Sequence, residues 1–255
     1  MKRPALLLMV SVMATMLATL LVTAGEAEAR KARRPRVPRV LAPTRSEVAT
    51  LLAAKLGHKA TVSKLVGPAG ALRWAALYLV RDHRRNTARY GVATVSRAPV
   101  TPEGAQGPIS IDGTAELPTA ATPSELIEPV QWGTAALKDQ DGDGKPELFV
   151  IYGYNGPMEA ALGDIYHREL ALLNLDGAPT LALHLELDER PEAMASREVL
   201  SKWSFSKPVP GSPPEVTMTS TIGDYDDRAR ARKVSVVKVT YRWDAAGDRW
   251  LRVAR

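Results

Sequence analysis

Hydrophobic and polar residues alternate along much of the chain with a period of two, which is the spacing of side chains on a β-strand. The clearest run places Leu181, Leu183, Leu185 and Leu187 on one face and Thr180, Ala182, His184 and Glu186 on the other. Similar alternation occurs over 216–222 and 237–243. One apolar face opposite one polar face is typical of antiparallel strands with one side in water, so these segments predict half-buried strands.

A different spacing predicts one helix at about 45–56. Thr44 and Glu47 form a capping box at its start, because each side chain can bind the backbone N–H of the other residue. Gly57 follows the last apolar residue and ends the helix. The apolar stripe between these ends consists of Val48, Leu51, Leu52 and Leu56. We expect this stripe to pack on a sheet.

Turn sequences connect the predicted strands as a meander. Residues 174–177 join the stretch 164–175 to the strand that starts at Thr180, and residues 244–248 make a terminal hairpin. The segment 71–81 is apolar on both strand faces. We interpret it as a buried strand, with a short helix as the alternative.

Two further features complete the predicted fold. Trp74 and Tyr78 are expected in the core, and a short strand is expected near 109–111, within the proline-rich segment 99–129. The patterns together predict a mainly β fold of antiparallel meander sheets, sandwich-like or partial-propeller-like, with one N-terminal helix. The chain of 255 residues is 45% hydrophobic and 24% charged, as in ordinary globular proteins. We expect a single β-rich domain over 46–255.

The N-terminus has the layout of a secretory signal peptide. Lys2 and Arg3 precede an apolar run over 5–24, and the small residues Ala27 and Ala29 flank Glu28 as in a cleavage site. We expect residues 1–29 to be removed, which predicts a secreted, periplasmic or cell-envelope protein. The alternative is an uncleaved membrane anchor, since about 20 apolar residues are enough to span a bilayer.

The positive charge of the chain is concentrated in one short segment. The formal net charge is +6, yet residues 30–45 carry seven basic residues and no acidic one, which leaves 46–255 with a net charge of −1. Its prolines and arginines predict an extended linker, and the alternative is a tether to an anionic surface or polysaccharide. No nucleic-acid partner is expected, because no aromatic residues are interleaved to stack on bases. A membrane is a partner only if residues 1–29 are retained.

The most informative motif is the loop Asp139–Glu147. Its carboxylates stand at loop positions 1, 3, 5 and 9, which are Asp139, Asp141, Asp143 and Glu147, and Gly144 at position 6 allows a sharp turn. Calcium prefers six to eight hard oxygens, and alternate residues of a tight loop can direct several carboxylates to one centre. The carbonyl of Lys145 at position 7 adds a backbone ligand. The alternative is an acidic surface turn, since this sequence also suits a turn.

The residues after the loop distinguish between families of calcium sites. An EF-hand has a bidentate Glu at position 12 and a helix on each side, whereas position 12 here is Val150 in the apolar run 148–152. A D-x-D-G-D-G-x-x-D/E loop that leads into an apolar strand resembles the FG-GAP/VCBS repeats of integrin-like β-propellers. The resemblance covers about 130–152 in a single copy, and Glu147 stands where that family usually has Asp. It implies that Asp139, Asp141, Asp143, Lys145 and Glu147 hold Ca²⁺.

Other chemical motifs are weaker. The acidic residues 224–227 form either a solvated turn or a second cation site. His167 and Glu169 lie on one side of a predicted strand, as an acid/base or metal pair would, and His184 is expected to be exposed. The chain has no cysteine, which excludes disulfides, zinc–thiolate sites, iron–sulfur clusters and thiol catalysis. It also lacks the G-x-S-x-G, H-E-x-x-H and phosphate-loop motifs.

These observations predict an exported, non-enzymatic β domain with a structural calcium loop, which binds or supports a component of the cell envelope or of the extracellular space. No catalytic residue is assigned. The alternative is a secreted hydrolase that acts on glycans with carboxylates from the regions 139–147 and 224–227. The two carboxylates of such an enzyme need only be close in space.

Overall fold

The computed structural model describes residues 41–68, 72–82, 87–100, 105–119, 131–157, 164–191, 197–207, 209, 214–226 and 231–253. All described residues belong to one compact unit, Val40–Arg255. The predicted signal peptide over 1–29 and most of the basic linker over 30–45 lie outside the described residues. Among the described residues, no helix is long and apolar enough to cross a membrane.

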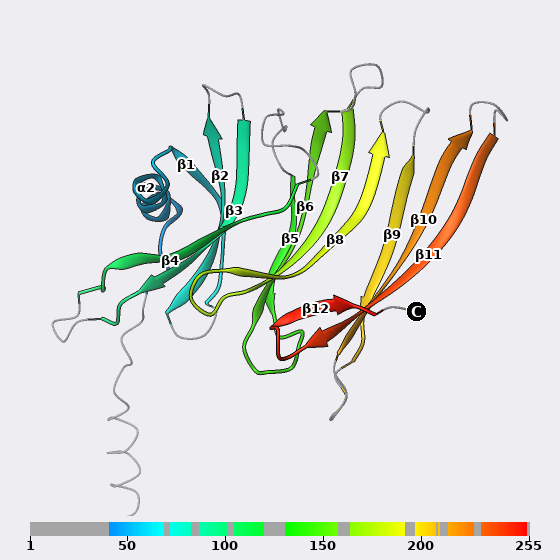
Figure 1. Cartoon of the computed structure of the whole chain (residues 1–255). Helices are drawn as coiled ribbons and strands as arrows, with labels where there is room; N and C mark the ends of the chain where they lie inside the picture. Colours follow the sequence, from blue (N-terminus) through cyan, green and yellow to red (C-terminus); the bar gives the residue numbers. More distant parts are fainter. Residues whose placement is uncertain are drawn as a thin grey trace, which may run out of the picture. The chain divides into compact units, whose positions relative to one another are not determined.

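The described chain forms two antiparallel sheets and one helix, α2 (Arg45–Leu56), so the predicted mainly β fold is confirmed (Figure 1). The four-stranded sheet has the order β1 (Ala60–Val66), β2 (Arg73–Asp82), β3 (Thr87–Arg97) and β4 (Ile109–Glu116). The eight-stranded sheet runs, in chain order, through β5 (Gln131–Lys138), β6 (Glu147–Pro157), β7 (Asp164–Asn174), β8 (Thr180–Pro191), β9 (Glu198–Phe205), β10 (Glu215–Asp226), β11 (Ala231–Asp244) and β12 (Arg249–Arg252). Within each sheet, every strand pairs with its neighbour in the chain, so both sheets are meanders, as the turn sequences predict.

The helix α2 is capped and packed as its sequence predicts. The Oγ1 atom of Thr44 accepts a hydrogen bond from the backbone N–H of Glu47 (3.2 Å), and Oε2 of Glu47 accepts one from the N–H of Thr44 (2.7 Å). Gly57 ends the helix with a φ of 71°. Val48 and Leu52 are fully buried in a cluster with residues of the four-stranded sheet, among them Trp74.

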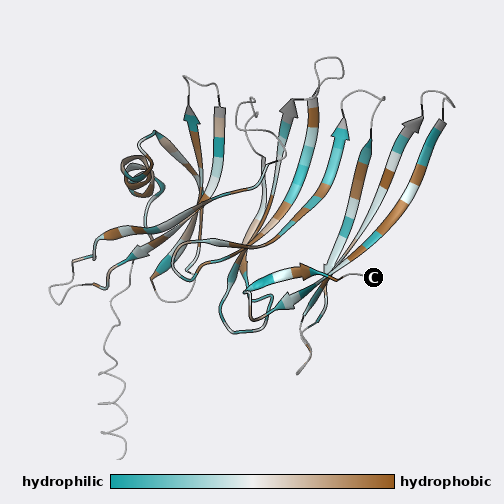
Figure 2. Cartoon of the chain, viewed as in Figure 1, coloured by the Kyte–Doolittle hydropathy of each residue, from teal (hydrophilic) through white to brown (hydrophobic). Residues whose placement is uncertain are grey.

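The two sheets face each other across a shared apolar core. The four-stranded sheet contributes Ala75, Leu77, Tyr90 and Val92, and the eight-stranded sheet contributes Leu148, Val150, Tyr152, Ala171 and Leu173. These two facing sheets confirm the sandwich-like option within the predicted fold class. Hydrophobic and hydrophilic bands alternate along β10 and β11 in Figure 2, as expected where only one face of a strand is buried.

The eight-stranded sheet also folds over a second core. The strands β8 and β9 pair only at Asp188 with Leu200 and at Glu189 with Val199, so the sheet can bend between them. The space inside the bend is filled by apolar side chains from both halves: Phe149, Leu170, Leu172, Leu183, Leu185, Leu187, Val216 and Trp250, with Trp203 and Phe205 against them. The strands β6 and β7 therefore have both faces buried.

The predicted apolar face of β8 is wrong at its first residue, Leu181. Leu183, Leu185 and Leu187 are buried, but Leu181 is 43% exposed. The cause is a shift of register, because Leu172 pairs with Leu183 whereas Leu173 pairs with Leu181. An extra residue in one strand moves the following side chains to the other face. Alternation within β8 alone does not reveal such a shift.

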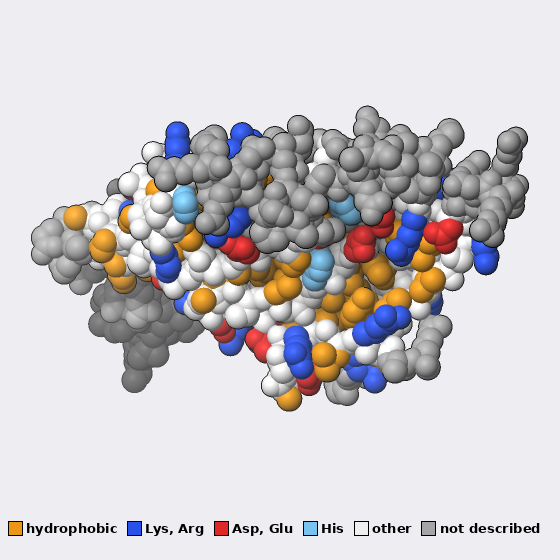
Figure 3. Space-filling model, turned by 45° about the horizontal axis from the view of Figure 1, so that its top comes forward, with side chains coloured by type: hydrophobic (Ala, Val, Ile, Leu, Met, Phe, Trp, Pro, Cys, Tyr) orange, Lys and Arg blue, Asp and Glu red, His pale blue; other side chains and the backbone are white. Residues whose placement is uncertain are grey.

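The remaining predicted strands are present, but Val237 on the predicted apolar face of 237–243 is 39% exposed. The surface agrees with the charge analysis. The segment 71–81 forms the buried strand β2, with Trp74 and Tyr78 6% and 3% exposed, and the strand near 109–111 is the longer β4. On the face drawn in Figure 3, acidic and basic side chains of the described residues are interspersed, without a large patch of one sign.

Candidate metal centre

The strands β5 and β6 hold the base of the acidic loop. Lys138 and Glu147 are a register pair of these antiparallel strands, so the chain must reverse direction between them. The four acidic side chains of the loop are thereby brought together: Asp139, Asp141, Asp143 and Glu147 each offer an oxygen, and these atoms all lie within 4.8 Å of one another. The structure thus assembles all four carboxyl groups that the sequence predicts as metal ligands.

Backbone N–H groups orient the carboxylates of the loop. The hydrogen bonds run from Gly142 N and Gly144 N to the two oxygens of Asp139 (2.8 and 3.1 Å), from Asp143 N to Asp141 (3.1 Å), from Lys145 N to Asp143 (2.7 Å) and from Gln140 N to Glu147 (2.7 Å). Each bond uses an acceptor lone pair and fixes the direction of a short side chain. The carboxylates are therefore positioned by the fold of the loop itself.

Two glycines allow the backbone of the loop to turn tightly. Gly142 and Gly144 have φ angles of 82° and 85°, in the left-handed region that glycine adopts without steric cost. A Cβ atom at either position would meet no atom within 4 Å. The requirement for glycine here is therefore conformational, and it does not come from crowding.

Burial and mutual repulsion change the ionisation of the loop carboxyls. Glu147 is only 4% exposed, and burial raises its pKa to about 8, with a further increase from the charges of Asp141 and Asp139. The pKa of Asp141 is also raised, first by burial and then by the charge of Asp143. A divalent cation among these groups would favour their ionised forms.

The side chain of Lys145 points away from the carboxyl cluster and joins the loop to a neighbouring turn. Its Nζ donates to Oδ2 of Asp176 at 2.6 Å, in the turn between β7 and β8. This hydrogen bond and the charge of Asp176 raise the pKa of Lys145. Arg73 of β2 reaches the other oxygen of Asp176 at 3.4 Å. The predicted metal ligand from Lys145 is its backbone carbonyl.

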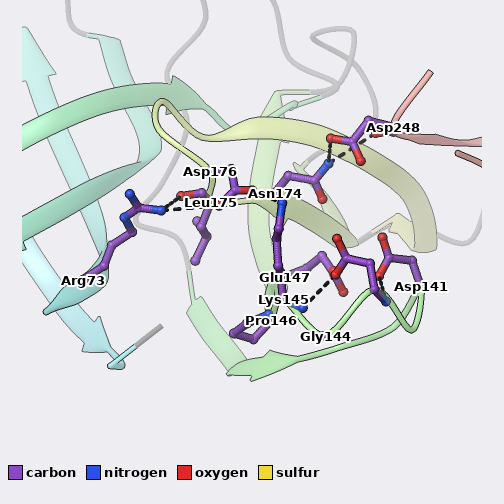
Figure 4. A pocket seen from close by; sticks show the side chains of 11 residues that line it. Arg73, Asp141, Gly144, Lys145, Pro146, Glu147, Asn174, Leu175, Asp176 and Asp248 are labelled. Carbon is purple, nitrogen blue, oxygen red and sulfur yellow. Dashed lines mark hydrogen bonds and ion pairs between the residues drawn. The ribbon is translucent and has the colours of Figure 1, made fainter. Parts of the chain in front are cut away.

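A cavity of about 410 Å³ opens beside the loop (Figure 4). It is lined by Asp141 and residues 143–147 of the loop, by the turn residues 174–176, by Arg73 and by Asp248. The side chain of Asn174 donates to Oδ2 of Asp248 at 2.6 Å, so the turn between β11 and β12 is tied to this site. Three of the four clustered carboxyl residues contribute to the wall of the cavity.

The second acidic segment lies elsewhere in the molecule. In a meander, alternate connections lie at opposite ends of the sheet. The loop 139–147 and Asp248 stand at one end, whereas Asp224 pairs with Lys233 next to the β10–β11 connection at the other. The side chains of residues 225–227 lie outside the described residues. Asp224 and the loop therefore do not form one hydrolytic site, as the alternative prediction would require.

A second polar cluster surrounds Glu169, which is 2% exposed. Its carboxylate accepts hydrogen bonds from Tyr152 Oη (2.9 Å) and from Tyr154 Oη, and it lies 2.5 Å from Nε2 of His184. His167 is not among these partners of Glu169, and its ring stacks on Tyr154 at 5.1 Å between ring centroids. His184 is exposed, as predicted, with 34% of its side-chain surface accessible, and its ring also contacts Glu169.

The sequence offers only a partial indication of the Glu169 cluster. Its members come from β6, β7 and β8, and Glu169 is a register partner of Tyr152. Alternation places Tyr152 and Tyr154 on one face of their strand, but only the register between strands brings them to Glu169. Strand register depends on neighbouring strands, which is why the sequence pattern misses the two tyrosines.

Comparisons with known proteins find no match. No protein-family model matches the chain, and neither does any curated protein or solved structure. The resemblance of residues 130–152 to FG-GAP/VCBS repeats therefore stays a prediction based on the loop sequence. The function has to be argued from the site itself.

Proposed function

We propose that this chain is an exported, non-enzymatic β domain whose loop 139–147 binds Ca²⁺, and that it binds or supports a component of the cell envelope or of the extracellular space. The observation that carries the proposal is the cluster of four carboxyl groups whose oxygens lie within 4.8 Å of one another. One of them, Glu147, is buried, where an ionised carboxylate is costly unless a cation compensates its charge.

The donor set favours calcium over other divalent cations. The cluster offers only oxygen donors from carboxyl groups, which suit Mg²⁺, Ca²⁺ and Mn²⁺ better than zinc or copper. Calcium accepts six to eight oxygens at about 2.3 to 2.6 Å, whereas Mg²⁺ usually keeps several waters and binds one or two carboxylates. Four carboxylates and the Lys145 carbonyl therefore fit Ca²⁺ best.

The role of the ion in this proposal is structural. It would neutralise repelling carboxylates and hold the β5–β6 connection in one conformation. The described residues that line the neighbouring cavity include no serine, histidine or tyrosine, and the proposal assigns the clustered carboxyl groups to the ion and not to proton transfer or nucleophilic attack. In an extracellular compartment, a dissociation constant of about 10⁻⁴ to 10⁻³ M is enough to fill such a site.

A calorimetric titration of the chelator-treated protein tests the proposal. We expect one Ca²⁺ to bind with a dissociation constant of about 10⁻³ M or tighter, and Mg²⁺ to bind more weakly. The double variant Asp141→Ala, Asp143→Ala removes two clustered carboxyls and should give no binding heat. The control Asp224→Ala removes a carboxyl at the other end of the sheet and should behave like the unmodified protein. Unchanged calcium binding by the double variant would contradict the assignment.

Export is proposed from the N-terminal sequence. The layout of residues 1–29 supports cleavage after Ala29. The intact mass of the protein recovered outside the cytoplasm tests this, and we expect a chain that begins at Arg30. Retention of Met1–Ala29 would favour a membrane-anchored protein instead.

The basic segment 30–45 is proposed as a tether to an anionic surface, either phospholipid or acidic polysaccharide. Its seven positive charges support such contacts. Sedimentation with anionic vesicles, compared with neutral vesicles and with a soluble polyuronate as competitor, tests the tether and distinguishes the two surfaces. Equal recovery with anionic and neutral vesicles, together with no effect of the polyuronate, would reduce the segment to a linker.

A further inference from the structure

The cavity beside the loop is built from four separate parts of the chain. The β5–β6 loop, the β7–β8 turn, the β11–β12 turn at Asp248 and Arg73 of β2 converge on it (Figure 4). Its volume of about 410 Å³ lies within the range of about 300 to 1,000 Å³ that small-molecule pockets occupy. The convergence of polar groups from distant segments on one cavity is typical of a ligand-binding site.

The proposed cation would form part of the wall of this cavity. The inference therefore rests on the proposed function, which places Ca²⁺ in the loop. Asp141, Asp143 and Glu147 belong both to the carboxyl cluster and to the cavity lining. Four carboxylates and one carbonyl, each giving one oxygen, leave at least one of the six to eight positions of Ca²⁺ to be filled. Neutral hydroxyl oxygens are hard ligands that suit such positions.

The charges of the lining exclude an anionic ligand. Five carboxyl residues line the cavity, namely Asp141, Asp143, Glu147, Asp176 and Asp248. The two basic residues of the lining, Arg73 and Lys145, both form ion pairs with Asp176. The lining therefore stays negative even with one divalent cation in the loop, and like charges repel most strongly where water is partly excluded.

The remaining polar groups suit a ligand that both donates and accepts hydrogen bonds. The amide nitrogen of Asn174 already donates to the carboxylate and to the carbonyl of Asp248. The amide oxygen of Asn174 and the second carboxylate oxygen of Asp248 remain as acceptors, and the Arg73 guanidinium adds N–H donors. Pro146 and Leu175 add apolar surface for C–H groups. We propose that the cavity binds a neutral, hydroxyl-rich ligand, a sugar residue of a glycan, through its hydroxyls, with the loop cation and Asn174 as the main contacts.

A glycan array tests the inference with the full chain in millimolar calcium and in chelator. Neutral glycans should be bound only with calcium, whereas binding of sulfated or uronate-containing glycans should come from the basic segment 30–45 and should not change with chelator. The variant Asn174→Ala should weaken neutral-glycan binding by about tenfold, the effect of about 1.4 kcal/mol, and leave calcium affinity unchanged. The control Asn155→Ala, at the opposite end of β6, should bind neutral glycans and calcium like the unmodified protein.

The outcomes separate this inference from the proposed function. Calcium binding without any neutral-glycan binding would overturn the inference and leave the calcium site standing. Neutral-glycan binding that survives chelation, or anionic-glycan binding that depends on both calcium and Asn174, would also overturn it. Absence of calcium binding by the unmodified protein would instead overturn the proposed function, and the inference with it.

Discussion

Glu147 is the residue whose ionisation depends most on what the loop binds. Its pKa of about 8 lies above the ordinary value of 4.5 because the side chain is buried beside other carboxyls. A raised carboxyl pKa means that the metal-free folded state holds a proton that the unfolded state releases. Proton binding therefore stabilises the fold fully below about pH 4.5, and this contribution is lost as the pH rises towards 8.

The first prediction concerns the pH dependence of stability without metal. In chelator, the free energy of unfolding should fall between pH 5 and pH 8 because Glu147 must ionise in a buried site. The variant Glu147→Gln cannot ionise, so it should show a flatter curve over this range. Urea unfolding at a series of pH values measures both. Parallel curves for the two proteins would contradict the assignment of this titration to Glu147.

The second prediction is that calcium affinity rises over the same pH range. Calcium must displace the proton from Glu147, so each pH unit below about 8 should weaken binding by up to about tenfold. Calorimetry in buffers of different ionisation enthalpy measures the affinity and the protons released. Binding without proton release near pH 7 would be inconsistent with a ligand role for Glu147.

The third prediction tests the turn geometry at Gly144. Its φ of 85° is costly for residues with a Cβ atom, so Gly144→Ala should destabilise the protein by about 1 to 2 kcal/mol. Gly144→Asn should cost less, because Asn tolerates the left-handed region better. Chemical denaturation gives both free energies. An equal cost for the two variants would point to another cause.

At the scale of single residues, the sequence identifies a site whose residues are contiguous in the chain. The carboxyl residues of the loop lie within nine positions, and local hydrogen bonds set their directions, so their spacing alone predicts the cluster. The partners of Glu169 lie on two other strands, at Tyr152 and His184. Their contacts depend on register between strands, which the alternation of one strand does not contain.

Among the elements, α2 is predicted almost completely, because its caps and apolar stripe are local. Burial within the stripe is uneven, however, since Leu52 is fully buried and Leu51 is only partly buried. The face of a helix that meets a sheet is set by packing, so the sequence gives the stripe but not its most buried member. The exposed Leu181 of β8 shows the same limit for strands.

The fourth prediction follows from this packing. Leu52→Ala should destabilise the protein by about 2 to 5 kcal/mol, the range for removal of a buried leucine side chain. Leu51→Ala should cost less because its side chain is partly in water. Equilibrium unfolding in denaturant compares the two variants directly. An equal cost would mean that α2 does not dock on the sheet through Leu52.

The fifth prediction concerns the open edge of β11. The strand pairs with β12 only at 241–244, and Val234 and Val236 of the remaining edge are 59% and 67% exposed. Lysines at an edge disfavour pairing with another chain, so replacing Lys233 and Lys238 by Val should cause self-association in sedimentation velocity. The matched variant Thr219→Val, Thr221→Val, on the central strand β10, should stay like the unmodified protein. Equal self-association of both variants would mean that the added hydrophobic side chains cause it, whether or not they lie on an edge strand.

At the scale of the whole described domain, packing between sheets outweighs the ion pairs that link them. Arg73, Asp176 and Lys145 connect the two sheets and the loop, but their side chains are 34%, 61% and 65% exposed. Exposed pairs of this kind contribute about 0 to 1 kcal/mol each. The shared core of Leu77, Tyr90 and its partners therefore holds the sheets together.

The cavity is the feature that the sequence could not predict. Its walls come from segments as distant as Arg73 and Asp248, and the fold of both sheets is needed to bring them together. The meander pattern places the β5–β6, β7–β8 and β11–β12 connections at one end of the sheet, but it does not show that they converge with Arg73 on one cavity. The candidate metal site was thus predictable from nine residues, whereas the cavity beside it depends on the complete fold.

Thermal unfolding with calcium and with chelator tests the central claim most directly. A ligand at 100 times its dissociation constant stabilises the folded state by about 2.7 kcal/mol, which shifts the midpoint of a protein of this size by about 5 to 10 °C. Calcium should raise the midpoint of the unmodified protein and of Asp224→Ala, and it should leave that of the Asp141→Ala, Asp143→Ala variant unchanged. Equal midpoints of the unmodified protein in calcium and in chelator would contradict the account.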